Sequence, residues 1–277
     1  MKVGQLSVLP FERQLAILEA LKEKGTIDVL TLARSLGVSA NTLRRDLTFL
    51  ESKGYLRRVY GGATIMTVSP LEAKYVNYNT RTALASERKD IIGMVAADMI
   101  EDGDTVILDS GTTTLQIARH LEGRHNVTVI TNDIKVAAEL CGKRGILVVT
   151  TGGFTDESFS SSGVIAERTI AEVRPDKVFL SSLGVSVKDG LTDGRMEQAT
   201  IKRVMANAGR EVILVADSSK VGKVLSCFIC PVSAITRWIT DDGVPPNVIA
   251  GVEKEGCEVI IAGREGGRAE QRGYLRR

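Results

Sequence analysis

The sequence of 277 residues predicts an α/β protein in two parts, an N-terminal winged helix-turn-helix domain and a larger, mostly parallel α/β domain. Helical spacing of leucines, followed by a glycine-centred hairpin, predicts the smaller part. Alternating strand and helix patterns predict the larger part. The charge divides in the same way: residues 1–66 carry ten Lys and Arg against six Asp and Glu, whereas residues 67–263 carry 21 against 26.

Changes in patterning predict four segments along the chain. Residues 1–66 form the winged helix-turn-helix domain, and residues 67–86, which contain Pro70 and a polar run, form a linker. The α/β domain spans residues 87–263. The tail from 264 to 277 is rich in Gly and Arg and poor in apolar residues, so we expect it to be disordered.

Two helices open the first domain. Apolar residues recur at helical spacing over Phe11–Lys24, and Gly25 ends that run. Asp28 is a suitable N-cap for a second helix, Asp28–Leu36, and Gly37 supplies the left-handed residue that follows it. A short turn that contains Gly37 then leads to a third helix, which is the arrangement of a helix-turn-helix.

The third helix, Ala40–Lys53, is capped by Ser39 and turns its leucines inward at Leu43, Leu47 and Leu50. Its first two turns leave a polar face free, which is composed of Asn41, Thr42, Arg44 and Arg45. Arg can form two hydrogen bonds with guanine, Asn can do so with adenine, and Thr can contact a thymine methyl group or a phosphate. These side chains therefore suit the major groove of DNA, although an amphipathic helix with a solvated polar face shows the same pattern.

A basic hairpin follows the third helix. Tyr55–Tyr60 alternates as a strand, Gly61-Gly62 forms the turn, and Ala63–Met66 returns. Arg57 and Arg58 are placed in this wing to meet phosphate or the minor groove. The whole pattern predicts a double-stranded DNA operator as partner, with Ser39, Asn41, Thr42, Arg44, Arg45, Arg57 and Arg58 at the interface. One such domain covers a half-site, so we expect a homodimer or homotetramer.

The larger domain alternates between the two element types. Helices are predicted at 87–100, 112–121, 133–140, 163–172, 197–208 and 247–254. Strands are predicted at 105–108, 127–131, 146–150, 177–181, 211–215, 234–239 and 257–261. Continuous apolar runs such as Val212–Val215 indicate strands that are buried on both faces, hence a mostly parallel sheet. Ligands of such sheets bind beyond the carboxyl ends of the strands.

The first loop at that edge has the composition of an anion site. It consists of Asp109, Ser110, Gly111, Thr112, Thr113 and Thr114. Gly111 allows the backbone to approach a ligand, a helix N-terminus offers unpaired amides, and the threonines offer hydroxyl donors. The loop lacks both the Lys of a nucleotide P-loop and the G-x-G-x-x-G pattern of a dinucleotide site. An ordinary helix-capping loop remains the alternative.

Further polar residues follow other strands. Thr131 and Asn132 follow the second strand, Gly152 and Gly153 the third, and the run from Asp217 to Lys220 follows Val212–Val215. Thr and Asn can bind hydroxyls, Lys220 can pair with phosphate, and Asp217 can accept a hydrogen bond from a sugar hydroxyl or position Lys220. A surface ion pair between Asp217 and Lys220 is the alternative.

At this point the sequence resembles a known family. The stretch VSANTLRRDLTFLESKGYLRRVYGGA resembles the N-terminal signature of the DeoR family of bacterial regulators, with Tyr60 where the family usually has His. The pieces ILDSGTTT, VITN, TTGG, a GLTD turn followed by IKR, and VADSSKVG resemble the effector domain of that family. That domain is related in fold to ribose-5-phosphate isomerase and glucosamine-6-phosphate deaminase. The resemblance covers Phe11 to about Gly263.

The resemblance implies a pocket for a phosphorylated sugar or its breakdown product. Its lining would be Asp109 to Thr114 with Thr131, Asn132, Gly152, Gly153, Lys202 and Lys220. Gln198 stands where many members carry Glu, and Val221 replaces a common Phe, so the identity of the ligand does not carry over. We therefore expect a sequence-specific transcriptional regulator, a repressor of a sugar or related carbon-metabolism operon, that responds to a sugar phosphate.

Two other functions fit parts of the sequence. An isomerase of phosphosugars with an attached DNA-binding domain would need an acid/base pair, for which Glu197 or Asp217 with Lys220 are available. A structural DNA-bridging protein would leave the anion loop unused. Of the three, we expect the regulator, which has no catalytic residues.

The composition limits the remaining classes. No run of about eighteen apolar residues occurs, and the N-terminus lacks the pattern of a signal peptide, so we expect a cytoplasmic protein without a membrane partner. Cys227 and Cys230 have C-x-x-C spacing, but no second Cys or His pair lies nearby in the sequence, which favours packing over a metal or redox role. We expect no metal site and no cofactor.

Overall fold

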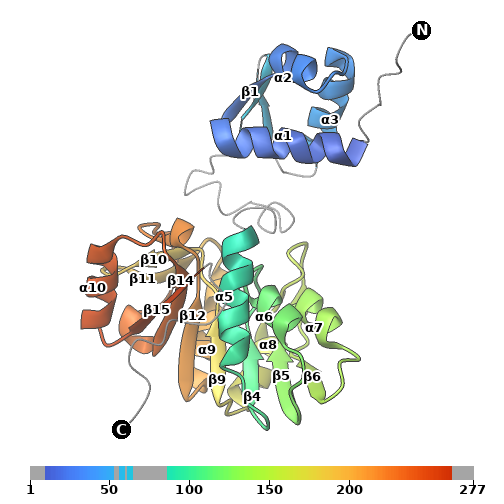
Figure 1. The fold of residues 1–277 in the computed structure, drawn as a ribbon. Coiled ribbons are helices and arrows are strands. Elements are labelled where there is room, and N and C mark those ends of the chain that lie inside the picture. The colour runs from blue at the N-terminus through green and yellow to red at the C-terminus, as the bar shows by residue number, and fades with distance from the viewer. Residues whose placement is uncertain (1–9, 53–55, 60, 65–85, 264–277) are drawn as a thin grey trace. The chain divides into compact units, whose positions relative to one another are not determined.

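The computed structural model of the chain describes residues 10–52, 56–59, 61–64 and 86–263, which belong to two compact units (Figure 1). The described part of the first unit ends at Thr64, and that of the second begins at Ser86. The predicted linker, apart from Ser86, and the C-terminal tail lie outside the described residues. The domain boundaries drawn from the sequence therefore stay predictions.

The first unit contains three helices, α1 (Pro10–Lys24), α2 (Val29–Ser35) and α3 (Ala40–Ser52). The three predicted helices are confirmed, with ends that differ by one residue at most from the sequence prediction. Their apolar faces form one core, in which the largest side chains are those of Ile17, Leu21, Leu43, Leu47 and Leu56. Each Å² of apolar surface removed from water contributes about 25 cal/mol of free energy, and this contribution holds the three helices together.

The caps form as the residue types predict. Asp28 accepts a hydrogen bond from the Thr31 amide at 2.8 Å, and Ser39 Oγ accepts one from the Thr42 amide at 3.0 Å. These contacts satisfy amides that the first turn of a helix leaves without a partner. Gly37 has a φ of +64°, in the left-handed region that ends a helix most easily with glycine.

The wing has three strands rather than the two predicted. Strands β2 (Arg57–Val59) and β3 (Gly62–Thr64) form the hairpin, and β3 also pairs with β1 (Thr26–Asp28), which the sequence analysis missed. The sheet order is β1-β3-β2. Gly62 is required at this pairing, because a Cβ atom there would lie 2.0 Å from the carbonyl oxygen of Ile27.

The second unit is built on a parallel sheet of seven strands. Its spatial order is β15-β14-β12-β9-β4-β5-β6. The strands are β4 (Thr105–Leu108), β5 (Val127–Thr131), β6 (Ile146–Thr150), β9 (Lys177–Leu180), β12 (Glu211–Val215), β14 (Arg237–Asp241) and β15 (Glu258–Ala262). All seven predicted strands are present and pair in parallel, as predicted.

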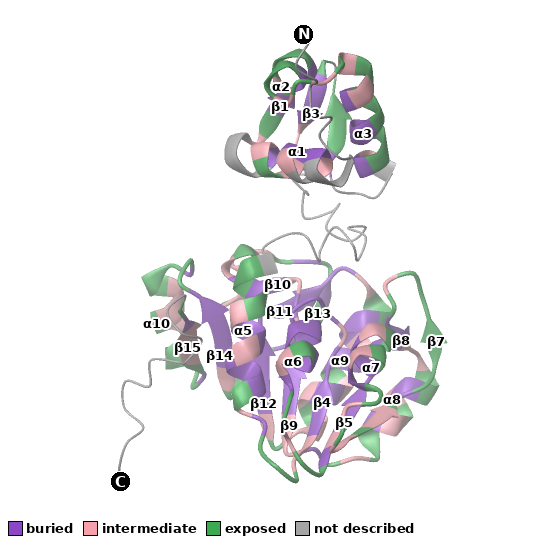
Figure 2. Cartoon of the chain, turned by 45° about the vertical axis from the view of Figure 1, so that its right-hand side comes forward, coloured by how far each residue is buried: buried purple, intermediate pink, exposed green. Residues whose placement is uncertain are grey.

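Helices cover both faces of the sheet. They are α5 (Ser86–Asp98), α6 (Thr114–His120) and α7 (Ile134–Leu140) on one face, and α8 (Val164–Ala171), α9 (Met196–Ala208) and α10 (Pro246–Lys254) on the other. Each face packs its own apolar cluster, and Figure 2 shows the buried strands between these layers. The strands are apolar on both faces because both faces are covered.

Two short antiparallel sheets were not predicted. One pairs β10 (Gly184–Ser186), β11 (Gly190–Asp193) and β13 (Cys227–Cys230), and the other pairs β7 (Phe154–Thr155) with β8 (Ser161–Ser162). The GLTD segment was expected to be a turn, which is wrong: it is the buried strand β11. Strand β11 pairs with β13, which is the C-x-x-C segment. Burial raises the pKa of the Cys230 thiol to about 11.

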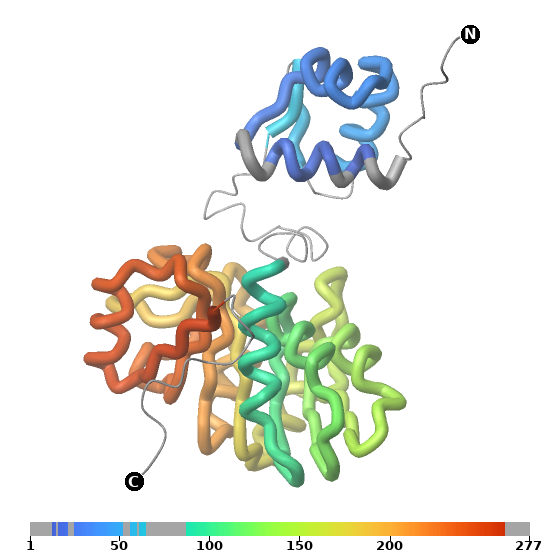
Figure 3. Tube along the Cα trace, in the orientation of Figure 1, coloured from blue at the N-terminus to red at the C-terminus, as the bar shows by residue number. Residues whose placement is uncertain are grey.

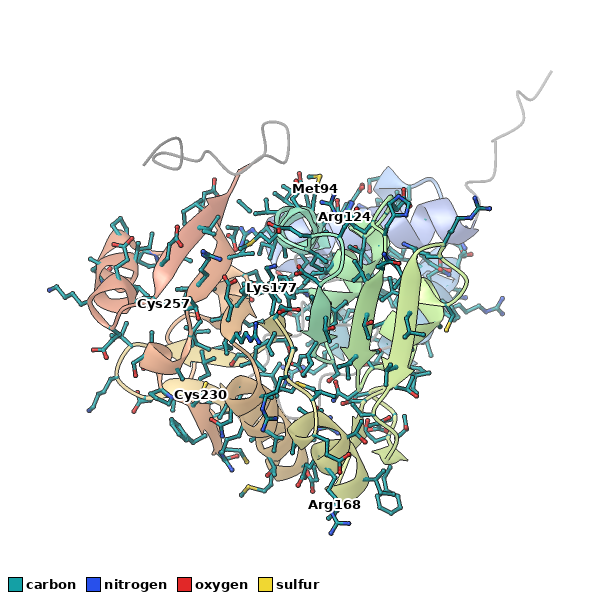
Figure 4. The ribbon with its side chains drawn as sticks, turned by 90° about the horizontal axis from the view of Figure 1, so that it is seen from below. Met94, Arg124, Arg168, Lys177, Cys230 and Cys257 are labelled. Carbon is teal, nitrogen blue, oxygen red and sulfur yellow. The ribbon has the colours of Figure 1, made fainter. Side chains whose placement is uncertain are left out.

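Structural ion pairs lie at the amino-terminal edge of the sheet, which faces the viewer in Figure 4. Lys177 at the start of β9 pairs with Asp104 at 2.6 Å. In the same view, Cys230 and Cys257 lie on separate elements, and the structure has no group of three His, Cys, Asp or Glu side chains suited to a metal among the residues it describes. No helix in the described ranges is both long and apolar enough to cross a membrane.

Candidate functional site

The polar face of α3 is exposed as predicted. Asn41, Arg44 and Arg45 are exposed, and together with Thr48 they line a hollow on this face. Arg44 donates a hydrogen bond to Asn41 Oδ1 at 3.1 Å, so the two side chains that would read bases are held side by side. Ser39 and Thr42 bond each other through their hydroxyls at 2.8 Å, and Ser39 Oγ also caps the helix by accepting from the Thr42 amide.

The wing is attached to the same helix. The Arg58 backbone amide donates to Glu51 at 2.8 Å, and its guanidinium donates to Thr48 Oγ1 at 2.8 Å. Arg57 and Arg58 are both exposed. The cationic side chains of α3 and of the wing therefore belong to one surface of the unit.

A buried ion pair joins α3 to α1. Arg13 of α1 and Asp46 of α3 form two hydrogen bonds, one of them 3.1 Å long between Nη2 and Oδ1. Sequence analysis quoted Asp46 only as part of a motif and assigned no role to Arg13. An Asp on the apolar side of an amphipathic helix was the signal that such a partner exists, since buried carboxylates are paired.

The second unit has its topological switch point between β4 and β9. From this point the chain builds β4, β5 and β6 outward in one direction and β9, β12, β14 and β15 in the other, as the colours of Figure 3 show. Loops diverge at such a point, and ligands of open parallel sheets bind there. The predicted anion loop, Asp109 to Thr114, follows β4 directly, and Ser181 follows β9.

Asp109 and Lys202 form an ion pair beneath this loop. The side chains are 0% and 3% exposed. Asp109 Oδ2 also accepts hydrogen bonds from the Ser181 amide and hydroxyl, each at 2.8 Å, and Oδ1 accepts one from the Ser110 amide at 2.7 Å. Lys202 reaches Ser181 Oγ at 2.9 Å. The predicted site residues Asp109 and Lys202 are thus brought together, and both are occupied by protein partners.

The loop keeps unused donors at Thr112 and Thr113. Helix α6 begins at Thr114, two residues later than predicted, so these two residues belong to the loop. Among the described residues, no acceptor bonds their backbone amides or their hydroxyls. By contrast, Thr114 Oγ1 donates to the Gly111 carbonyl at 3.0 Å. The donor set available to an anion is therefore centred on Thr112 and Thr113.

Asp133 is a site residue that the sequence analysis missed. Its Oδ2 accepts the Gly111 amide at 3.2 Å, and its Oδ1 caps α7 through the amides of Lys135 and Val136. Burial raises the pKa of Asp133 to about 6. The signal was an Asp at the first position of the predicted helix 133–140, since Asp is a preferred N-cap residue.

Of the other residues predicted at strand ends, some are bonded within the protein and others are exposed. Thr131 Oγ1 donates to the Leu108 carbonyl at 2.7 Å and accepts from the Asp133 amide, so its hydroxyl is occupied within the protein. Asn132 is 1% exposed and donates to Ser160 Oγ and to the Ser161 carbonyl. Gly152 and Gly153 are exposed and have positive φ values, at the start of the β7–β8 hairpin.

Asp217 and Lys220 lie together at the end of β12. Burial acts to raise the pKa of Asp217, but the charge of Lys220 and the hydrogen bond from Ser219 outweigh it, so this pKa is lowered. Asp217 Oδ2 is buried and has no hydrogen-bond donor among the described residues. Glu197, the other acid considered for catalysis, is exposed on α9.

The fold and these sites define a class of protein: a winged helix-turn-helix unit with an exposed basic surface, joined in one chain to a parallel α/β unit with a donor-rich loop at its switch point. Residues 13–68 match the DeoR-like helix-turn-helix domain, and residues 84–242 match the DeoR C terminal sensor domain. The chain belongs to the DeoR family of transcriptional regulators.

Two relatives span nearly the whole chain. It is 33% identical to the HTH-type transcriptional regulator GolR of Listeria innocua, over 92% of this chain and 100% of that protein. It is also 33% identical to the putative aga operon transcriptional repressor of Escherichia coli O157:H7, over 91% of this chain and 94% of that protein.

Among solved structures, ribose 5-phosphate isomerase from Plasmodium falciparum is similar with a TM-score of 0.36 and 16% identity. The match covers 48% of this chain and about half, 52%, of that one.

Proposed function

We propose that this regulator is a repressor whose sensor domain binds a phosphorylated sugar and whose affinity for its operator changes when that ligand binds. The transcriptional class follows from the family. The direction of control is suggested by the repressor name of the aga operon relative. A ligand that binds one conformation better than the other shifts the population toward it, and this difference is the source of control.

The observation that carries the ligand assignment is the donor set of the switch-point loop. Thr112 and Thr113 offer two amides and two hydroxyls with no acceptor among the described residues. Such donors suit the oxygens of a phosphate group. Lys202 neutralises Asp109 at the floor of the loop, so this carboxylate does not repel an incoming anion with its full charge.

The proposed lining of the effector site is that of the sequence prediction, with roles refined by the contacts. Thr112 and Thr113 hold the anionic group, with Ser110 and Gly111 beside them in the loop, and Lys220 follows β12, two strands along the sheet from β4. Asp109, Thr114, Thr131, Asn132, Lys202 and Asp217 shape the site through their own hydrogen bonds and charges. Gly152 and Gly153 supply exposed backbone at its rim.

The proposed operator contacts are Asn41, Arg44 and Arg45 in the major groove, with Arg57 and Arg58 on the phosphate backbone. Ser39 and Thr42 shape the start of the reading helix. We take residues 1–66 and 87–263 as the two domains, and we propose that the protein acts in the cytoplasm as a homodimer or homotetramer, so that two or more reading helices meet a palindromic operator.

Thermal unfolding of the full chain with a panel of sugar phosphates, each paired with its unphosphorylated sugar, tests the ligand. An effector raises the unfolding temperature in a concentration-dependent manner, because it binds the folded state only. Thr113→Val should abolish this rise, whereas Thr128→Val in β5 should keep it. A panel in which no phosphorylated compound shifts the wild-type transition contradicts the proposal.

Mobility shift on the promoter region of the neighbouring genes tests the DNA function. Binding should weaken steeply as salt rises, because phosphate contacts release counterions. The assigned effector, added at saturation, should change the affinity. A regulator of this kind has no turnover: saturable isomerisation of ribose 5-phosphate or a hexosamine 6-phosphate by the chain would instead support the enzyme alternative.

A further inference from the structure

The side-chain carboxamide of Gln198 lies next to the switch-point loop and has no role in the function proposed above. Gln198 is 4% exposed and stands one helical turn before Lys202, on the same buried face of α9. Its Oε1 accepts a hydrogen bond from Ser160 Oγ at 3.0 Å and a longer one from Ser110 Oγ at 3.4 Å. Gln198 therefore joins the loop to the β7–β8 hairpin.

The orientation of this carboxamide follows from a chain of hydrogen bonds. The Ser161 carbonyl can only accept, so Asn132 must turn its nitrogen toward it, at 3.1 Å. The same nitrogen donates to Ser160 Oγ at 3.2 Å, which leaves the Ser160 hydroxyl proton free to point at Gln198 Oε1. In this arrangement the oxygen of Gln198 accepts from two serine hydroxyls, and its nitrogen makes no hydrogen bond with them.

That nitrogen, Nε2, has no acceptor among the described residues. Three other buried side-chain atoms lack a partner there, Asn132 Oδ1, Asp217 Oδ2 and Thr240 Oγ1, and each is sealed from solvent. Gln198 Nε2 is not among these sealed atoms, so it keeps some exposure although the whole residue is only 4% exposed. A water molecule can serve such a donor, and an acceptor oxygen of a ligand can take the place of that water.

We propose that Gln198 determines the specificity of the effector site by donating a hydrogen bond from Nε2 to an acceptor oxygen of the ligand, such as a carboxylate, keto or phosphate oxygen. This inference rests on the proposed function, and it adds a requirement on the ligand: besides the phosphate group held at Thr112 and Thr113, an oxygen acceptor faces α9. Turning the carboxamide round to accept from the ligand would give up the hydrogen bonds that Oε1 accepts from Ser110 and Ser160.

Gln198→Glu tests this with little change of shape. The glutamate retains an oxygen for both serine hydroxyls but replaces the donor by a negative oxygen, which repels an acceptor. Asn207→Asp makes the same chemical change at an exposed position of the same helix and serves as the control. Isothermal titration of the full chain is performed with the sugar phosphates of the thermal panel and with inorganic phosphate.

We expect each sugar phosphate that binds the wild type to bind Gln198→Glu at least tenfold more weakly, and Asn207→Asp unchanged. The ratio of the dissociation constant of Gln198→Glu to that of the wild type should fall at low pH, because the glutamate gains a proton and with it a donor. A purely structural role would not produce this recovery. Equal binding by the wild type and Gln198→Glu overturns the inference alone. Absence of binding by the wild type overturns the proposed function and this inference with it.

Discussion

Lys202 of α9 and Asp109 at the end of β4 form an ion pair that solvent hardly reaches, with 3% and 0% of their side chains exposed. The two residues are far apart in the sequence, and their pairing joins a helix of one face to the switch point of the sheet. Asp193 lies close enough to feel the charge of Lys202, while its own burial raises its pKa. The charge of Lys202 thus pairs with Asp109 and offsets only part of the effect of burial on Asp193.

Lys202→Met should destabilise the protein by about 3–5 kcal/mol, because it leaves the buried carboxylate of Asp109 without compensation. The free energy of unfolding from chemical denaturation measures this. Arg210→Met is the matched control: the Arg210 side chain is 78% exposed and lies 3.7 Å from Asp176, so its loss should cost about 0–1 kcal/mol. Equal effects of the two changes would mean that the buried pair contributes no more than a surface one.

Asp133 should make stability depend on pH between about 4 and 6. Its pKa is raised to about 6 in the folded protein, from 3.8, so the folded state binds this proton more tightly than the unfolded state does. The corresponding stabilisation is complete below about pH 4 and is lost as the pH rises through about 6. Asp133→Asn should flatten this part of the curve of unfolding free energy against pH.

The control for this titration is Asp98→Asn, since the Asp98 side chain is 68% exposed. It should preserve the pH dependence of the wild type. A curve for Asp133→Asn that overlays the wild type between pH 4 and pH 6 would refute the assignment of this titration to Asp133.

Arg44 and Arg57 should affect DNA binding in different ways. Arg44→Ala should cost about 1–3 kcal/mol and relax the preference at one operator position, because it removes a contact with a base. Arg57→Ala should weaken binding to all sequences about equally and reduce the slope of log affinity against log salt by about 1. Fluorescence anisotropy on operator and unrelated DNA, at several salt concentrations, distinguishes the two.

Lys254→Ala on α10 serves as the control for these two changes, and its salt dependence should match that of the wild type. An Arg44→Ala protein with unaltered sequence preference would exclude Arg44 from base contact.

Gly93 should not tolerate a side chain. A Cβ atom there would lie 2.3 Å from Gln116 Cβ and 2.8 Å from its carbonyl carbon, so α5 and α6 would have to separate. Gly93→Ala should therefore cost about 1–3 kcal/mol of overpacking, against the gain of about 1 kcal/mol that alanine brings to a helix. Gly251→Ala in α10 meets only Val187 methyl groups, at 3.1 Å and beyond, and should lie within about 1 kcal/mol of the wild type. Chemical denaturation compares the two.

Most of the fold was predictable because its signals are local. The leucines of α3 repeat at 3.6-residue spacing, and β12 is a continuous apolar run, so each reports its own structure. Strands such as β1 and β11 were missed because they are three and four residues long and exist through pairing with distant segments. Both cysteines of the C-x-x-C segment lie in the apolar core, but the pairing of this segment with β11 depends on contacts that no local pattern encodes.

The candidate site was predictable in position but less so in roles. Parallel strands present their carboxyl ends at one edge, so Asp109, Thr131 and Asp217 were expected at that edge. Which hydroxyl or amide stays free depends on distances across the fold. The Thr131 hydroxyl donates to the Leu108 carbonyl, whereas the Thr113 hydroxyl has no acceptor among the described residues, although both threonines belong to the same strand-to-helix pattern. Asp133 and Gln198 act through partners that lie in other segments, so their neighbours in sequence reveal little.

The short strand between the first two helices has a mechanical consequence for control. Strand β1 hydrogen-bonds to β3 of the wing and continues directly into α2. The hairpin therefore cannot move away from the helices without breaking the hydrogen bonds between β1 and β3. If ligand binding controls the operator as proposed, we therefore expect it to change the position of the whole helix-turn-helix unit, hairpin included, and not the angle of the hairpin within the unit.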